Sequence, residues 1–351
     1  MVIPTIRENC FRDLVARWGP MGLFDECDLI LMEDNPVKTF DLDKVITPAV
    51  GVKSRHTHLD WTDIKRHLKD EEWIVPRRSD TVRSFAYWYA WREGYKYILT
   101  LDDDCYPPSM VNDGYEYRDA KQFVDSHINA MNGKTKWFNT LNSVKPRGIP
   151  FYERGRRDDI IVNHGLWTNV IDYDAPTQLV DPKPEEFSFD NKVIPHGSFF
   201  PMCGMNVMWK AKYTVLMYHL LMGQEVTGEV DVSLPNISND IVQPLPFDRF
   251  GDIWCGILMK KCADILGKSV TTGTPYIRHE RASNPFTNLK KEAPGLEVNE
   301  KFWVYVDTFD PSYDGNDPAT LYIELGEHIR NFKEYPQHIT YFKNLGEAMT
   351  R

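Results

Sequence analysis

The sequence predicts an α/β fold, in which a mainly parallel but mixed β-sheet is covered by helices on both faces. Three short apolar runs, at residues 2–4, 28–32 and 97–101, have the length of strands. Segments with helix caps and stop residues alternate with such runs. Strands that are apolar on both faces and alternate with helices are typical of a sheet with helices packed on each side.

The first third of the chain carries a separate signal for each element. Gly19-Pro20 and Gly22 mark turns between the first two strands, so both helix and loop remain open there. Ser79 or Asp80 can cap a helix that ends near Arg92. The other predicted element here is a strand at 73–75.

The rest of the chain alternates between weak and strong periodicity. Residues 133–201 predict loops with short strands, and residues 225–248 predict an exposed excursion. The strongest helix is at 251–266, because its apolar residues recur on one face. The other predicted elements are strands at 206–209 and 270–277 and helices at 213–222 and 321–332.

The composition indicates a globular chain and excludes several classes of function. At 351 residues, with 42% hydrophobic and 13% aromatic residues, the chain can bury a large core. A net charge of -10 disfavours binding to nucleic acid or to anionic membranes. The six cysteines form no CxxC pair, and neither a secretion signal nor a membrane-length apolar run is found. We therefore expect a cytoplasmic protein with no membrane span and no nucleic-acid partner.

Polar clusters follow three predicted strands, at residues 5–7, 33–35 and 102–104. The carboxyl ends of parallel strands lie at one edge of a sheet, where α/β folds bind ligands. Three consecutive carboxylates raise one another's pKa unless a cation is present. Because Mg²⁺ and Mn²⁺ bind carboxylate and phosphate oxygens, Asp102-Asp103-Asp104 predicts a divalent ion that bridges the protein and a pyrophosphate. An acidic turn with solvated side chains is the alternative.

Arginines close to these strand ends are candidates for binding the phosphates. Arg7 follows the first strand, and Arg78 and Arg83 flank the start of the helix that leads to the acidic strand. A guanidinium group can bind phosphate with two hydrogen bonds, although ordinary surface ion pairs are the alternative for each arginine. The group Arg147, Arg154, Arg156 and Arg157 has the composition of a basic loop.

Histidine and aspartate side chains near predicted turns are further candidates. His279 closes a late strand, from which it can reach the same metal. Asp252 stands in the first turn of a predicted helix, where the helix dipole is a sufficient explanation for a carboxylate. A histidine such as His164 is more often a hydrogen-bonded structural residue than a ligand.

Together these motifs resemble the reversibly glycosylated polypeptides, a family whose members interconvert UDP-arabinopyranose and UDP-arabinofuranose. Seven stretches carry the resemblance, in family order, from the N-terminus to about residue 295. They are VIPTIR (2–7), LDDDC (101–105), FNTL (138–141), HGLW (164–167), DYDAPTQL (172–179), FPMCGMN (200–206) and ASNPF (282–286).

The resemblance implies a GT-A-like catalytic domain at residues 1–295, with a C-terminal helical extension at 296–351 packed on it. It implies Mn²⁺ or Mg²⁺ as cofactor, with Asp104 as the main ligand and Asp102 and His279 as further ligands. It also implies that Asp103 contacts the ribose and that Asp34 faces the uridine. The implied substrate-binding residues are Thr5, Arg7, Asp34, Arg78, Arg83, Asp102, Asp103, His164, Trp167 and Asn206.

The catalytic residues implied by the resemblance are Arg147, Arg154 and Asp252. Arg147 stands in the sequence context of the arginine that the family glycosylates on itself, and Arg154 follows it. We expect Arg147 to position the substrate, because a guanidinium is charged at neutral pH and is a poor nucleophile. Gly251 stands where plant members carry an acid, which leaves Asp252 to act alone.

The leading hypothesis is a mutase that breaks and re-forms the bond between the anomeric carbon and the phosphate within one closed site. Its substrate and partner is a UDP-sugar, UDP-L-arabinopyranose, which it converts to the furanose form. Transfer of the sugar to a separate acceptor is a second hypothesis, and a non-catalytic UDP-sugar-binding subunit is a third. Whether the chain forms a homo-oligomer is left open.

Overall fold

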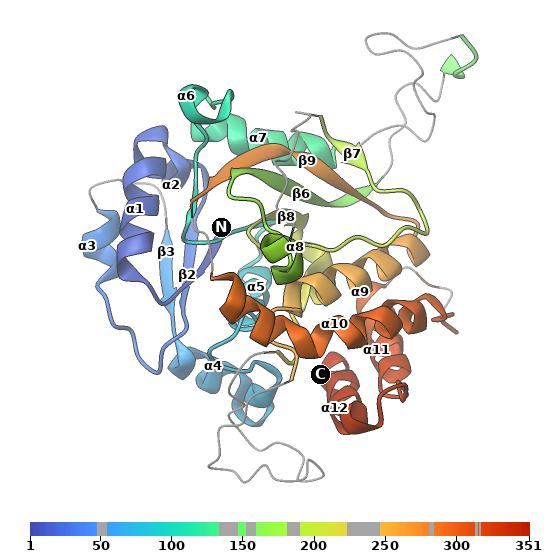
Figure 1. Cartoon of the computed structure of the whole chain (residues 1–351). Helices are drawn as coiled ribbons and strands as arrows, with labels where there is room; N and C mark the ends of the chain where they lie inside the picture. Colours follow the sequence, from blue (N-terminus) through green and yellow to red (C-terminus); the bar gives the residue numbers. More distant parts are fainter. Residues whose placement is uncertain are drawn as a thin grey trace.

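The computed structural model (Figure 1) describes residues 1–47, 55–132, 147–151, 159–180, 190–222, 246–280, 284–312, 315 and 317–351. Within these residues, nine strands form one sheet in the order β3-β2-β1-β4-β8-β6-β9-β5, with β7 paired to β9. The strands are β1 (Val2–Thr5), β2 (Leu29–Glu33), β3 (His56–Leu59), β4 (Tyr97–Leu101), β5 (Cys105–Tyr106), β6 (Ile160–Asn169), β7 (Lys192–Val193), β8 (Asn206–Lys210) and β9 (Ser269–His279).

The sheet is mixed, with most strands running in one direction. β3, β2, β1 and β4 are parallel, and β6 and β9 run in the same direction as they do. β8 is antiparallel to its neighbours β4 and β6, and the short strands β5 and β7 are antiparallel to β9. The predicted mainly parallel, mixed sheet is therefore confirmed.

Helices cover both faces of the sheet, as the apolar strands require. One core contains Val2, Ile30 and Ile98, and the other contains their chain neighbours Ile3, Leu31 and Leu99, as expected from alternation along a strand. The first core is covered by α5 (Val82–Arg92) and α9 (Gly251–Ile265), and the second by α1 (Glu8–Trp18) and α7 (Ala120–Met131). The predicted α/β class with helices on both faces is confirmed.

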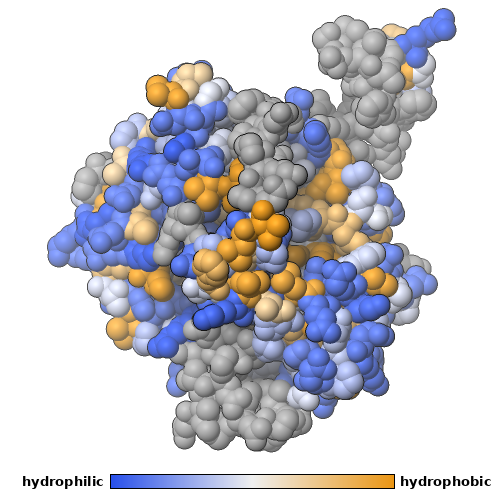
Figure 2. Space-filling view, viewed as in Figure 1, coloured by the Kyte–Doolittle hydropathy of each residue, from blue (hydrophilic) through white to orange (hydrophobic). Residues whose placement is uncertain are grey.

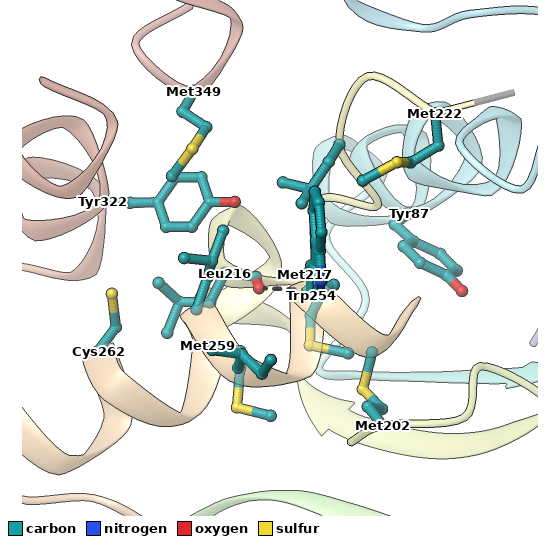
Figure 3. Packing of buried hydrophobic residues seen from close by; sticks show 14 of the residues in the cluster. Tyr87, Met202, Leu216, Met217, Met222, Trp254, Met259, Cys262, Tyr322 and Met349 are labelled. Carbon is teal, nitrogen blue, oxygen red and sulfur yellow. Dashed lines mark hydrogen bonds between the residues drawn. The ribbon is translucent and has the colours of Figure 1, made fainter. Parts of the chain in front are cut away.

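Three C-terminal helices extend the first core. These are α10 (Pro285–Asp307), α11 (Pro318–Ile329) and α12 (Ile339–Met349). Figure 3 shows Trp254 and Met259 of α9 together with Tyr87 of α5, and with Tyr322 and Met349 of the C-terminal helices. Because these side chains belong to one apolar cluster, the C-terminal helices share their core with the sheet.

Two strands differ from the prediction. Residues 73–75 form no strand: they lie at the end of the 3₁₀ helix η2 (Lys69–Ile74), from which Trp73 and Val75 enter the core. The third parallel strand is β3, whose polar sequence is tolerated because it lies at the edge of the sheet. In the region expected to hold only loops and short strands, β6 is a strand of 10 residues between β8 and β9.

Two predicted helices have other bounds or another form. The segment predicted as a helix at 213–222 is the 3₁₀ helix η4 (Ala211–Met217). The Thr214 hydroxyl bonds to the Ala211 carbonyl at 2.7 Å, and such local bonds compete with a regular helix. α11 begins three residues before its predicted start at 321, because Asp317 caps it and Pro318 occupies its first turn.

The predicted division of the chain at residue 295 falls inside α10, which is continuous from Pro285 to Asp307. The division into two domains therefore remains a prediction. Of the excursion predicted at 225–248, residues 225–245 lie outside the described part of the chain. The described helices include none with the length and hydropathy needed to span a membrane.

On the face seen in Figure 2, apolar surface gathers over α8 (Ala175–Val180) and the start of α10. Its exposed members include Leu179, Val180 and Phe286. Single exposed apolar side chains are normal in folded proteins. A contiguous apolar group, by contrast, is a surface that water hydrates less favourably than the polar surface around it.

We predict that Gly256→Ala destabilises the protein by about 1–3 kcal/mol. A Cβ at Gly256 would lie 2.6 Å from the Met202 backbone nitrogen, so α9 would have to move away from the segment that precedes β8. Urea denaturation followed by circular dichroism measures the change. Lys301→Ala, at an exposed position of α10, is the control with no expected loss. Equal stability of Gly256→Ala and wild type would contradict this packing argument.

Candidate active site

The candidate site lies at the carboxyl ends of β1, β2 and β4, where the end of β9 joins them. β4 ends at Leu101, and Asp102, Asp103 and Asp104 follow directly. Cys105 of β5 then pairs with His279 of β9. This pairing brings the acidic stretch beside the end of β9, although the two are far apart in the chain.

Asp103 anchors the acidic stretch to β1. Its side chain is 2% exposed and accepts hydrogen bonds from the Thr5 hydroxyl and, at 3.0 Å, from Arg7 Nε. Arg7 Nη2 also pairs with both Asp103 and Asp104, the latter at 3.1 Å. Asp103, Thr5 and Arg7 therefore lie together as predicted. The Asp103 carboxylate is turned toward β1 and is fully engaged by the protein.

Asp104 and His279 face each other across the β4 and β9 ends. Asp104 Oδ1 lies 3.9 Å from His279 Nε2. His279 Nδ1 donates to the Val170 carbonyl at 3.0 Å, so Nε2 is the ring nitrogen that faces Asp104. Burial and the neighbouring Asp102 carboxylate raise the pKa of Asp104, against the lowering effect of Arg7 and His279. Its negative charge is therefore incompletely compensated.

Asp102 is bound by Arg83 from α5. The distance from Arg83 Nη2 to Asp102 Oδ1 is 3.0 Å, and the Asp102 side chain is 31% exposed. Arg83 Nη1 donates to the Gly204 carbonyl at 2.8 Å, and Arg83 Nε contacts Asp80 Oδ1 at 2.5 Å. Arg83 thus joins the acidic stretch to the segment before β8. Around Asp104, however, the described residues include no third His, Cys, Asp or Glu close enough to complete a metal site.

Asp252 lies at the first turn of α9, close to the same segment. Its Oδ2 accepts from the Gly204 backbone N–H at 3.0 Å. Burial, with the charge of Asp80 as a second cause, raises the pKa of Asp252 to about 6, and Asp172 adds to this effect. Such a carboxyl group can exchange a proton near neutral pH. A helix dipole lowers the pKa of a carboxyl group at the first turn, so it does not explain the raised pKa of Asp252.

Asp34 supports the site from β2. It accepts hydrogen bonds from Trp61 Nε1 at 2.7 Å and from the backbone N–H groups of Arg78 and Ser79, each at 3.0 Å. Burial raises the pKa of Asp34, although these donors oppose the shift. The exposed Arg78 lies over the Trp61 ring, with 6.0 Å between its guanidinium carbon and the ring centre. Asp34 therefore fixes the turn that leads into α5.

His164 and Asn206 lie behind the site. His164 is 3% exposed, accepts from the Cys203 N–H at 3.3 Å and contacts the Thr272 hydroxyl at 3.0 Å. Burial lowers the pKa of His164 to about 4, so the ring is neutral. Asn206 is fully buried and donates to the carbonyls of Leu166 and Pro275.

Both polar groups are thus used by the protein, and they hold β6, β8 and β9 together. The half-buried Trp167 packs edge-on against His164, with 5.8 Å between ring centres.

Of the two arginines with implied catalytic roles, only Arg147 belongs to the described residues. Arg154, with Arg156 and Arg157, lies outside them. Arg147 is exposed, and Figure 1 shows segment 147–151 (light green) at the edge of the molecule, away from the sheet.

Three residues that the structure places near Asp252 have no functional role predicted from the sequence. These are Asp80, Asp172 and His219. Asp80 is predicted only as a helix cap, and Asp172 belongs to one of the stretches that resemble the family. His219 follows η4 in a segment with no motif, so nothing in the sequence marks it.

Comparison with known proteins gives a family match over the whole chain. The family model described as "Reversibly glycosylated polypeptide" matches residues 1–351. A probable UDP-arabinopyranose mutase 1 of Pisum sativum is 34% identical, over 99% of this chain and 87% of the relative. UDP-arabinopyranose mutase 3 of Arabidopsis thaliana is 33% identical, over 94% of this chain and 83% of the relative.

Solved structures give only weak matches. A mannosyltransferase of Pyrobaculum calidifontis in complex with GDP-Man and Mn²⁺ is 9% identical with a TM-score of 0.35, covering 99% of this chain and 84% of that one. S. aureus TarS 1-349 is 10% identical with a TM-score of 0.36, covering 99% and 88%. These scores are too low to support an argument.

We predict that Asp103→Asn lowers the free energy of unfolding by about 2 kcal/mol, because it removes a buried charge that binds Arg7 and Thr5. Asp125→Asn is the matched control, since Asp125 forms an exposed ion pair with Lys121 and its loss should cost less than about 0.5 kcal/mol. Urea denaturation at neutral pH measures both. Equal losses in the two variants would show that Asp103 does not anchor the site.

Proposed function

The chain belongs to the reversibly glycosylated polypeptide family, and we propose that it is a UDP-sugar mutase that interconverts UDP-L-arabinopyranose and UDP-L-arabinofuranose. Relatives named UDP-arabinopyranose mutase, which align over nearly the whole chain, support this activity. The main structural support for this activity is that Asp104 lies close to His279, while Arg7 and Arg83 pair with the same acidic stretch. Metal-binding and phosphate-binding groups thereby share one edge of the sheet.

Asp104 and His279 are the residues proposed to hold a divalent ion, Mn²⁺ or Mg²⁺, with Asp102 as the further ligand of the proposal, although the described residues form no three-residue metal cluster. Both carboxylates supply the oxygen ligands that these ions prefer, and His279 Nε2 is directed toward Asp104 with its other nitrogen held by a carbonyl. The incompletely compensated charge of Asp104 favours a cation at this point. The remaining ligands would be diphosphate oxygens. When bound, the ion would stabilise the negative charge of UDP as a leaving group.

The protein's own residues act on the two parts of the substrate. Two arginines bind the diphosphate through their guanidinium groups. Asp103 orients Arg7, and Asp80 and Asp102 orient Arg83. Asp252, with a pKa of about 6, takes up or returns the proton of a sugar hydroxyl. Because the sugar and UDP stay in one site, their recombination is effectively unimolecular.

The other residues named in the sequence analysis act indirectly in this proposal. His164 holds the segment before β8, and Asn206 ties β8 to β6 and β9. Trp167 packs on His164, and Asp34 with Arg78 shapes the nucleotide side of the site. We assign Arg147 a positioning role rather than that of an obligatory glycosyl acceptor, with Asp252 as its partner, and Arg154 remains a proposed catalytic residue. We also propose a cytoplasmic location, with which the six free cysteines agree.

The activity is tested by incubating the purified chain with UDP-L-arabinopyranose and Mn²⁺ and then separating the nucleotide sugars. We expect UDP-L-arabinofuranose without net release of UDP. Release of UDP that depends on an added acceptor would indicate a glycosyltransferase instead. Binding without conversion would indicate a non-catalytic subunit. Mass spectrometry of the protein from the same reaction, with Arg147→Ala as the variant, tests the arginine: continued turnover by this variant excludes an obligatory arginyl intermediate.

The metal assignment predicts that His279→Ala weakens Mn²⁺-dependent binding of UDP by about 10-fold to 100-fold. Isothermal titration of UDP with and without Mn²⁺ measures this. His196→Ala is the control, because His196 is exposed and contacts the Asp264 carbonyl at the far end of α9. Binding of UDP by His279→Ala with unchanged metal dependence would remove His279 from the ligand set.

A further inference from the structure

Behind Arg83 lies a pair of titratable groups, the buried His219 and the half-buried Asp80, to which the proposed function gives no role toward Asp252. Asp80 Oδ2 contacts His219 Nδ1, and Asp80 Oδ1 contacts Arg83 Nε at 2.5 Å. The His219 side chain is 0% exposed. Within the described structure its other nitrogen, Nε2, has no hydrogen-bond partner. A buried ring nitrogen without a partner is costly, so a purely structural role accounts poorly for a histidine here.

The Gly204 peptide links this pair to Asp252. Its carbonyl accepts from Arg83 Nη1 at 2.8 Å, and its N–H donates to Asp252 Oδ2 at 3.0 Å. A Cβ at Gly204 would lie 2.7 Å from Arg83 Nη1, so only glycine lets the guanidinium approach the backbone this closely. The contacts therefore run without a break from His219 through Asp80, Arg83 and Gly204 to Asp252.

The charges around Asp252 come from several elements. Asp80 and Arg83 lie at the start of α5, His219 follows η4, and Asp172 precedes α8. Asp80 and Asp172 disfavour the ionised form of Asp252, whereas His219 and the Gly204 N–H favour it. The arrangement thus balances like and unlike charges at the carboxyl group that would exchange protons with the sugar.

We propose that Asp80 and His219 form a positioning pair, which holds Arg83 and the Gly204 peptide in place and thereby sets the direction and the charge of the Asp252 carboxyl group. This inference rests on the proposed function only in giving Asp252 its role with the sugar. Neither member of the pair touches the substrate. Their effect is transmitted through Arg83, Gly204 and the electric field at Asp252.

The pair is tested first without turnover, by following the titration of Asp252 in the metal-free full-length protein. Carbon-13 NMR of protein labelled at the aspartate carboxyl carbons gives the midpoint, and Asp252→Asn assigns the signal. Asp80→Asn removes a repelling charge, so the midpoint should fall by about one pH unit. His219→Leu leaves the charge of Asp80 less compensated, so the midpoint should rise.

A matched control is available on the same helix. Asp264 forms a buried ion pair with Lys260 at 2.6 Å near the C-terminal end of α9. Asp264→Asn makes the same chemical change as Asp80→Asn, yet the Asp252 midpoint should stay unchanged. His219→Asn is the conservative variant, because its amide N–H can replace the Nδ1 donor to Asp80. It should raise the Asp252 midpoint less than His219→Leu does, because it keeps a hydrogen bond to Asp80 but lacks the charge of the ring, and it serves as the test if another variant does not fold.

Turnover gives a second readout. With UDP-L-arabinopyranose and Mn²⁺, Asp80→Asn should lower kcat about 10-fold, with a smaller change in KM. The acid limb of its rate profile should move to lower pH, in the same direction as the NMR midpoint. His219→Asn should retain most of the wild-type kcat, whereas His219→Leu should not.

The proposal is overturned if Asp80→Asn and His219→Leu move the Asp252 midpoint in the same direction or leave it unchanged. It is also overturned if Asp264→Asn shifts the midpoint as much as Asp80→Asn does. If wild type forms no isomer, the proposed function fails, but the NMR titration still decides whether the pair acts on Asp252.

Discussion

Three adjacent carboxylates at the end of a strand buried on both faces carry more negative charge than the chain around them can solvate. Each is compensated from a different part of the molecule: Asp103 by Arg7 after β1, Asp102 by Arg83 of α5, and Asp104 by Arg7 and the end of β9. Because a buried carboxylate without a partner is strongly unfavourable, these contacts constrain how β1, β9 and α5 meet β4. The geometry of the candidate site follows from that requirement.

The negative charges of the three aspartates are compensated to different degrees, and this difference gives the carboxylates different chemical roles. Asp103 is enclosed and engaged by two partners, so it acts as an anchor. Asp104 keeps a raised pKa, and Asp102 remains partly exposed, which is why the proposed function assigns these two to a cation. At the first turn of α9, burial and the like charge of Asp80 raise the pKa of Asp252 to about 6. The fold thus keeps one carboxylate for structure and leaves the others available for binding and proton exchange.

The sequence predicts the parts of the site that depend on local signals. An apolar strand followed by acids places the Asp102 stretch, and its position relative to Arg7 and Arg83 follows from the rule for strand ends. Local patterns do not reveal which way a side chain turns. The contacts of Asp103 with a ribose and of Asp34 with the uridine remain predictions, and the sequence gives no sign of the protein partners that these side chains bind. Asp103 binds Thr5 and Arg7, and Asp34 binds the turn before α5.

Elements that owe their form to distant contacts were not predictable. β3 has a polar sequence and becomes a strand by pairing with β2, and β6 lies in a region of weak periodicity and is stabilised between β8 and β9. His219 has no motif, and only the folded chain brings it to Asp80. Tertiary contacts outweigh local preference at each of these places.

The pairing of Cys105 with His279 has a consequence for how the chain folds. The parallel strands β1 to β4 are formed by the first third of the sequence, whereas β9 is synthesised much later. Contacts between such distant segments form slowly, because a long loop must close first. During translation the acidic stretch therefore leaves the ribosome well before its histidine does, and the nascent N-terminal region must remain soluble with that charge only partly compensated.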